Sequence, residues 1–182
     1  MSSEATGFKL IGVRHLATTS FLKAERHHIL SPTGVVMERS VVRHPGAVAV
    51  VPVHGDDVVL ISQYRAPIGR DLLEIPAGKL DMPGEDPIEA AGRELEEEVG
   101  LRATSLELLA SFWTTPGFSN EYMWIYLASD LTPVEARPHG AEEEVAEIVR
   151  IPLDEVAARV AAGEFDDAKT IVGLAALAAR LS

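Results

Sequence analysis

Two β-branched runs stand close together in the sequence and limit the folds open to the chain. "GAVAVVPV" (46–53) and "DVVLISQY" (57–64) are separated only by "HGD", so they predict a β-hairpin whose buried faces supply core. Further strands are predicted over 105–113, 121–129 and 145–151. At 182 residues the chain is long enough for one well-buried core, and we expect a single domain with a short N-terminal appendage.

Three helices are predicted between and after these strands. The first begins at Asp86 and Pro87, where aspartate can cap the helix and proline suits its first position, and it ends at Gly100. Residues 153–164 and 167–181 have apolar side chains at helical spacing and are predicted to be packing elements. Strands and helices do not alternate regularly, so the pattern favours an α+β fold over a doubly wound sheet.

The overall charge of the chain is strongly negative. Sixteen Lys and Arg against 28 Asp and Glu give a formal net charge of -12, which opposes binding to nucleic acid or to anionic lipid. Cysteine is absent, which excludes disulfides and thiolate metal sites and permits a reducing compartment. The first thirty residues contain no apolar run long enough for a signal peptide or a membrane span. We therefore expect a cytoplasmic protein without nucleic-acid or membrane partners.

The first predicted helix is crowded with carboxylates. Its apolar residues share one stripe that we expect to be buried: Ile88, Ala91, Leu95 and Val99. Glu94, Glu97 and Glu98 gather on another side, where each close like-charge pair destabilises the helix by roughly 0.2–0.5 kcal/mol. For an arbitrary run of glutamates, a solvated acidic face is the more common explanation. A hard divalent cation would make the clustered carboxylates favourable, because Mg²⁺ takes oxygen ligands and often combines one or two carboxylates with substrate phosphates.

The spacing around this helix matches a known motif. Residues 78–101, "GKLDMPGEDPIEAAGRELEEEVGL", closely resemble the Nudix box, G-x5-E-x7-R-E-U-x-E-E-x-G-U, where U is aliphatic. Every fixed residue type has a match, and the one departure is an extra residue between Gly78 and Glu85. A longer loop there can shift a backbone carbonyl while leaving the helix in register.

The resemblance implies a fold and a metal site. The fold would be an α/β/α sandwich with a mixed central sheet, in which an N-terminal β extension (1–45) precedes the Nudix domain (46–182). The cofactor would be Mg²⁺ or Mn²⁺, with ligands from the carbonyl of Ala77 and from Glu94, Glu97 and Glu98. The structural residues of the motif would be Gly78, Glu85, Arg93 and Gly100. Of these, Glu85 and Arg93 would brace the loop and the helix.

Three further segments point to one subfamily. "LLEIPAGKLD" (72–81), "TTPGFSNE" (114–121) and "DAKT" (167–170) resemble ADP-ribose pyrophosphatases, which would make ADP-ribose the substrate and AMP and ribose 5-phosphate the products. Two alternatives stay open. One is a Nudix hydrolase of another nucleoside diphosphate sugar or of an oxidised nucleotide, and the other is a non-catalytic nucleotide-binding module that regulates another protein. Such modules often lose box glutamates, whereas this chain retains all of them.

The same resemblance assigns roles to residues outside the helix. Besides Glu97 and Glu98, a catalytic glutamate is expected in "HGAEEEVAE" (139–147), either Glu143 or Glu142. The substrate-binding residues would be Arg65 for the diphosphate or terminal ribose and Arg39 for the partner's adenosine, and Phe118, or alternatively Phe21, would stack on adenine. The protein would be a homodimer in which N-terminal strands from residues 8–45 cross to the partner.

Overall fold

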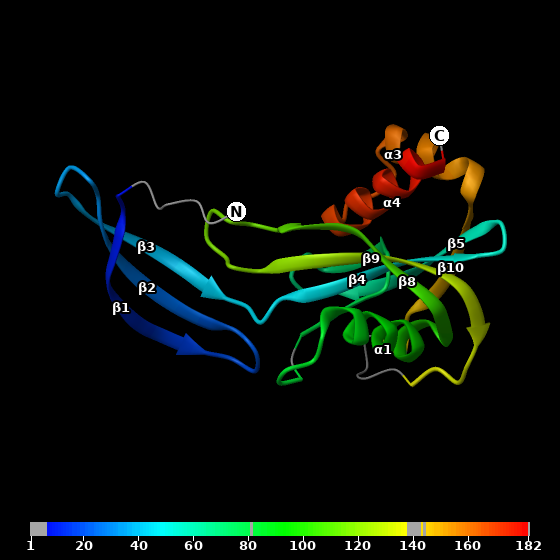
Figure 1. Cartoon of the computed structure of the whole chain (residues 1–182), viewed down its shortest axis with the longest axis horizontal. Coiled ribbons are helices and arrows are strands. Elements are labelled where there is room, and N and C mark those ends of the chain that lie inside the picture. The colour runs from blue at the N-terminus through cyan, green and yellow to red at the C-terminus, as the bar shows by residue number, and fades with distance from the viewer. Residues whose placement is uncertain (1–6, 81, 138–142, 144, 182) are drawn as a thin grey trace. The chain divides into compact units, whose positions relative to one another are not determined.

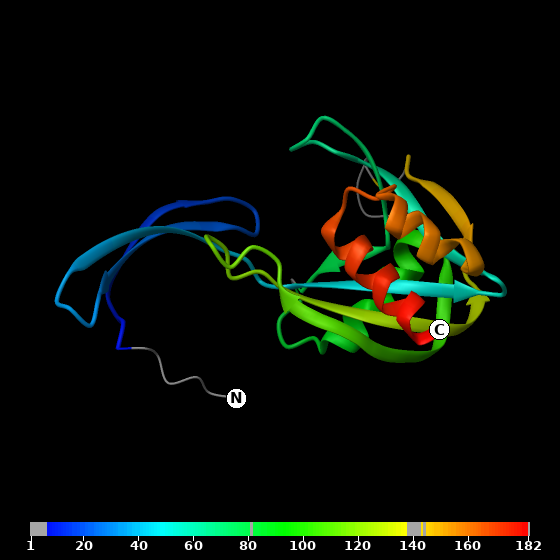
Figure 2. The same cartoon turned by 90° about the horizontal axis from the view of Figure 1, so that it is seen from above.

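The computed structural model describes residues 7–80, 82–137, 143 and 145–181 (Figures 1 and 2). The chain divides into two compact units. The smaller comprises Met1–Gly46 and Trp113–Tyr122, and the larger comprises Ala47–Phe112 and Met123–Ser182.

The larger unit is built on a mixed sheet. Within the described residues its strand order is β10 (Glu147–Pro152), β5 (Asp57–Arg65), β4 (Ala47–His54), β9 (Tyr122–Pro133) and β8 (Leu101–Trp113), with β6 (Arg70–Glu74) beside β5 and β7 (Ala77–Lys79) beside β4. β4 and β5 form the predicted antiparallel hairpin, with Val53 opposite Val58. β4 and β9 run parallel, so the sheet is mixed as predicted. The first six residues of β4 are buried, which fits a central strand covered on both faces.

Helices cover both faces of this sheet. Their bounds are α1 (Pro87–Val99), η1 (Leu153–Glu155), α3 (Val156–Ala162) and α4 (Ala168–Leu181). Successive side chains of a strand point to opposite faces, so Val48 joins the core cluster that contains Leu95 of α1, whereas Val51 joins the cluster that contains Leu174 of α4. Figure 1 shows α1 on one side of the strands and α3 and α4 on the other. The predicted α/β/α sandwich is thereby confirmed.

The ends of α1 follow the predicted signals, but its buried stripe differs in one position. Asp86 accepts a hydrogen bond from the Ile88 N–H (3.0 Å), and Gly100 ends the helix in the left-handed region with φ 67°. Ala91 and Leu95 are fully buried as expected. The prediction for Ile88 was wrong, because this residue in the first turn lines a surface pocket and is 40% exposed.

The smaller unit contains the N-terminal β sheet. β1 (Lys9–Thr18), β2 (Lys23–Leu30) and β3 (Val36–Arg43) pair antiparallel in that order, which confirms the predicted N-terminal β extension. Residues 113–122 join this unit through a backbone hydrogen bond from Val42 N–H to the Phe118 carbonyl (2.8 Å). Its large apolar side chains are widely exposed: Phe8, Leu10, Ile11, Val13, Leu16, Phe21, Val35 and Val36.

None of the described helices is both long and apolar enough to cross a bilayer. The cytoplasmic location stays a prediction.

Candidate active site

Two carboxylates of α1 lie directly against the backbone of β7. A Cβ built on Gly78 would overlap the Glu94 carboxylate, so only glycine fits at that position without moving the acid. One residue earlier, the Ala77 N–H donates to Glu98 Oε2 at 2.9 Å. The glycine of the sequence motif therefore has a structural role. Because Gly78 has no side chain, β7 can lie directly against the acidic face of α1.

Arg93 connects the loop to the helix. Its Nε and Nη2 donate to the two oxygens of Glu85 at 2.9 and 3.1 Å, and its Nη1 donates to Glu94 and Glu97 at 2.8 and 2.9 Å. The hydrogen bonds to Glu85, with those to the two helix glutamates, raise the pKa of Arg93 further above its ordinary value. One guanidinium therefore fixes three carboxylates, which suits its planar fork of donors.

At the junction of α1 and β7, the negative charge of the carboxylates exceeds the positive charge that Arg93 supplies. Burial raises the pKa of Glu98 to about 8, assisted by the charges of Glu94 and Glu143 and opposed by the Ala77 N–H and Arg65. Burial also raises the pKa of Glu94 above its usual range, although Arg93 opposes that shift. Desolvated carboxylates that repel one another are stabilised by an added cation.

The donor atoms at this junction suit a hard divalent cation. Carboxylate and carbonyl oxygens are the ligands that Mg²⁺ and Mn²⁺ prefer. In the described part of the chain, no group of three or more histidine, aspartate or glutamate side chains is already arranged around a common metal point. The present hydrogen bonds explain this, since Glu98 faces the Ala77 N–H and Arg93 occupies oxygens of Glu94 and Glu97. The residues fit a metal chemically, while the bound arrangement requires these contacts to be exchanged.

Arg65 lies close enough to the acidic cluster to interact with it electrostatically. Its charge lowers the pKa of Glu98, and Glu98 in turn helps to raise the pKa of Arg65, although hydrogen bonding to Glu74 is the largest cause of that rise. Arg65 Nε and Nη2 donate to the two oxygens of Glu74, both at 2.7 Å. The side chain of Arg65 is one-third exposed, so it can contact a ligand.

A buried ionic cluster continues from Glu74 into the start of α4. Lys169 Nζ also bonds to Glu74 Oε2, and it donates to Asp167 Oδ2 at 3.0 Å. The Thr170 hydroxyl donates to the same Asp167 oxygen at 2.6 Å and accepts from the Ile75 N–H at 2.9 Å. The sequence motifs "LLEIPAG" and "DAKT" are therefore in contact, which no local pattern predicts. An acid within an apolar stretch, such as Glu74, is the signal that a buried charge needs partners.

The loop glutamates are only partly described. Glu143 is half-buried, and its charge raises the pKa of both Glu94 and Glu98, so it lies near the α1 carboxylates. Glu142 falls outside the described residues.

Arg39 and Phe118 belong to the smaller unit. Arg39 on β3 donates to the Glu38 carbonyl at 2.8 Å and contacts Met37 Sδ at 3.7 Å. Phe118 is 55% exposed. The contacts of Arg39 and Phe118 with substrate stay predictions.

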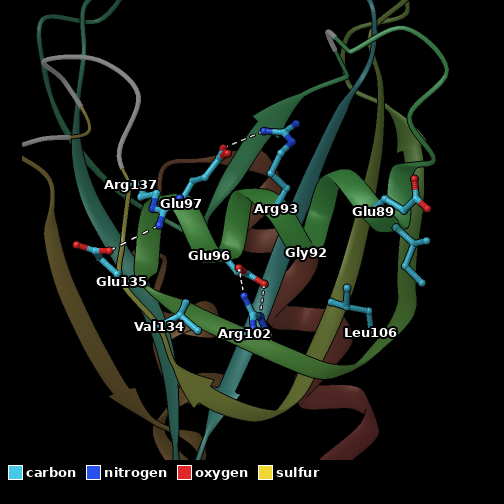
Figure 3. A pocket seen from close by; sticks show the side chains of 11 residues that line it. Glu89, Gly92, Arg93, Glu96, Glu97, Arg102, Leu106, Val134, Glu135 and Arg137 are labelled. Carbon is cyan, nitrogen blue, oxygen red and sulfur yellow. Dashed lines mark hydrogen bonds and ion pairs between the residues drawn. The ribbon is translucent and has the colours of Figure 1, made fainter.

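A pocket of about 640 Å³ follows the other side of α1 (Figure 3). Its lining includes Glu97 and Arg93 but not Glu94, Glu98 or Arg65. Figure 3 shows the Glu97 carboxylate turned toward Arg93, so Glu97 lies at the boundary between this pocket and the acidic junction. The remaining lining residues are Ile88, Glu89, Gly92, Glu96, Arg102, Leu106, Val134, Glu135 and Arg137.

Comparison with known proteins assigns the chain to a family. The family model described as NUDIX domain matches residues 43–172. The chain is 36% identical over 167 residues to the methanol dehydrogenase activator of Bacillus methanolicus, which covers 91% of this chain and 90% of that protein. It is 39% identical over 172 residues to the ADP-ribose pyrophosphatase of Mycobacterium tuberculosis (strain ATCC 25618 / H37Rv), which covers 93% of this chain and 83% of that protein.

A solved structure shows the same fold. The crystal structure of an ADP compounds hydrolase superposes with a TM-score of 0.82 and 29% sequence identity, covering 99% of this chain and 97% of that one. With the relatives above, it confirms the predicted enzyme class, a Nudix pyrophosphatase, at the level of the family. The chain belongs to the NUDIX domain family.

Proposed function

We propose that this protein hydrolyses the pyrophosphate bond of ADP-ribose, giving AMP and ribose 5-phosphate, with Mg²⁺ or Mn²⁺ as cofactor. The observation that carries the proposal is the junction of α1 and β7, where Glu94 and Glu98 are held desolvated against Gly78 and Ala77. The ADP-ribose pyrophosphatase and ADP compounds hydrolase similarities support the substrate class.

Glu94, Glu97, Glu98 and the carbonyl of Ala77 would hold the cation. When bound, a divalent cation supplies activation of water and neutralisation of phosphate charge. Without a cation, the hydrogen bonds from Arg93 hold the carboxylates of Glu94 and Glu97 in place.

The other proposed roles belong to groups that contact the diphosphate or the water. Arg65 donates to diphosphate oxygens, since guanidinium matches phosphate geometry and stays charged. Glu143 or Glu142 accepts the proton of the attacking water. The proximity of Glu143 to the α1 carboxylates supports the first of these, and both are retained as candidates.

Hydrolysis of ADP-ribose is the direct test. ADP-ribose has no terminal phosphate monoester, whereas both products do, so released phosphate is measured after a phosphatase is added to protein, ADP-ribose and Mg²⁺. Glu98→Gln should lower the rate by at least about 100-fold. Glu96→Gln is the matched control, because Glu96 lies on the same helix and pairs with Arg102 outside the junction. An inactive wild type, or a fully active Glu98→Gln, would refute the proposal.

A substrate panel separates ADP-ribose from the alternatives. The panel contains other nucleoside diphosphate sugars and oxidised nucleoside triphosphates, with products identified by chromatography. The proposal expects the highest kcat/KM for ADP-ribose and a nucleoside monophosphate among the products. A higher kcat/KM for another compound would retain the Nudix chemistry and replace the substrate.

A regulatory function is the second candidate, favoured by the similarity to a methanol dehydrogenase activator. Retention of Glu94, Glu97 and Glu98 in their helical register favours catalysis in this chain. If wild type and Glu98→Gln are equally inert across the panel but bind nucleotide, the regulatory interpretation replaces the enzymatic one.

We also propose that the protein is a homodimer that pairs through its N-terminal sheet. β1 has nine exposed residues out of ten, and apolar side chains such as Leu10, Ile11 and Val13 are about half exposed. A three-stranded sheet with so little burial needs a partner surface. Light scattering should give about 39 kDa, twice the chain mass of 19.6 kDa. A species of chain mass in an active sample would contradict the dimer.

A further inference from the structure

The carboxylate of Glu74 is almost completely buried between two cations. Its side chain is 1% exposed, against 11% for Lys169 and 34% for Arg65. Burial alone would raise the pKa of Glu74, but hydrogen bonds and charges from Arg65 and Lys169 outweigh it and hold the pKa below its usual value. A carboxylate kept charged at this depth depends on its cationic partners, because a buried charge without any partner is strongly destabilising.

The hydrogen bonds use one edge of the Arg65 guanidinium. Nε and Nη2 donate to Glu74 Oε1 and Oε2, which forms a planar fork at 2.7 Å on both sides. Among the described residues, Nη1 makes no hydrogen bond. The guanidinium is therefore held by its inner edge, while the end that carries Nη1 is left for a ligand.

We propose that Glu74 is a positioning residue for catalysis, which holds Arg65 by its Nε–Nη2 edge so that the free end of the guanidinium meets the diphosphate of the substrate. This inference rests on the proposed function. Glu74 itself does not contact substrate, because its oxygens are taken by Arg65 and Lys169.

Lys169 has a different part in this arrangement. It is held by Asp167 as well as by Glu74, and Asp167 also binds the Thr170 hydroxyl and N–H at the start of α4. Lys169 therefore anchors Glu74 to α4 through Oε2, the oxygen that also accepts from Arg65 Nη2. Removing the lysine amine takes away one ion pair from Glu74 but leaves the Arg65 fork complete, so Lys169→Met is a matched stability control.

A double-mutant cycle tests the proposal. Wild type, Glu74→Gln, Arg65→Lys and the double variant are compared for kcat and KM with ADP-ribose and Mg²⁺, and Lys169→Met is measured beside them. Lysine keeps the charge at position 65 but cannot form the fork. Glu74→Gln should lower kcat/KM by about 10- to 100-fold, the loss that a misplaced contact produces. Because it acts through Arg65, it should lower kcat/KM less than about threefold further in the Arg65→Lys background.

The outcomes are distinguishable from failure of the proposed function. If the wild type is inactive on the whole panel, the proposed function fails. If the wild type is active and Glu74→Gln keeps kcat/KM within about twofold, or if the two single losses multiply in the double variant, the positioning role is overturned. It is also overturned if Lys169→Met loses as much activity as Glu74→Gln at an equal drop in Tm. Should Glu74→Gln not fold, Glu74→Asp keeps the charge and shortens the reach, and its cycle with Arg65→Lys decides by the same criterion.

Discussion

Replacing Glu98 with glutamine should stabilise the metal-free protein at alkaline pH. In the folded chain, burial and the charges of Glu94 and Glu143 raise the pKa of Glu98 to about 8, above its ordinary value of 4.5. The unfolded chain ionises this group near the ordinary value, so between these two pH values the folded state binds more protons than the unfolded state. The stability of the wild type therefore falls as pH rises through that window, whereas Glu98→Gln has no such loss.

The size of this effect follows from the shift. At about 1.36 kcal/mol per pKa unit, the wild type loses roughly 2 kcal/mol by pH 6 and roughly 4 kcal/mol by pH 8. Because Glu98 is only partly buried, water and salt screen its charge, and we expect a measured difference of about 1–3 kcal/mol at pH 8. Glutamine retains an oxygen that accepts from the Ala77 N–H, so the contact at 2.9 Å is kept.

Urea unfolding in EDTA between pH 5 and pH 8 measures the difference. The free-energy gap between Glu98→Gln and wild type should widen as pH rises. Glu96→Gln is the control on the same helix, because a hydrogen bond from Arg102 lowers the pKa of Glu96 and its removal should not stabilise the protein at any pH. If the free energies of unfolding of wild type and Glu98→Gln change in parallel across this pH range, burial and neighbouring charges do not raise the pKa of Glu98, and this account of the junction is wrong.

Three further results are expected. Gly78→Ala should lower hydrolysis at least about 100-fold, because its Cβ would displace the Glu94 carboxylate, and steady-state kinetics on folded variant measure the loss. Thr170→Val should lower the free energy of unfolding by about 1–3 kcal/mol, since the Ile75 N–H loses its buried acceptor, and urea titration checks this. Mg²⁺ should raise the Tm of wild type, more at pH 8 than at pH 6 because the ligand carboxylates must be ionised, and Glu98→Gln should lose most of the rise in thermal melts.

Local signals were sufficient for some elements and not for others. The cap at Asp86, Pro87 in the first turn and Gly100 in the left-handed region fixed α1, because each acts within a few residues. β7 contains only three residues, 77–79, and exists because it pairs with β4, so no periodic pattern marks it. β1 and β2 have few buried side chains, and the N-terminal sheet was predicted only through the family resemblance.

Local signals also predicted some contacts of the candidate site and not others. The spacing of Glu94 and Glu98 predicted that their carboxylates are neighbours, since helical geometry decides it. The motif marked Gly78 as a structural residue, and the structure shows the reason, because a side chain at this position would overlap the Glu94 carboxylate. The pairing of Glu74 with Lys169 was not predicted, because the two residues are 95 positions apart in the chain.

The central claim is that the acidic edge of α1 binds a divalent cation that holds a diphosphate. A crystal structure with Mg²⁺ and a non-hydrolysable ADP-ribose analogue tests it most directly. We predict oxygens of Glu94 and Glu98 at about 2.0–2.1 Å from Mg²⁺, with the diphosphate on the same ion and the Arg65 guanidinium against it. Carboxylates that keep their present protein contacts, with nucleotide and metal bound elsewhere, would contradict the claim.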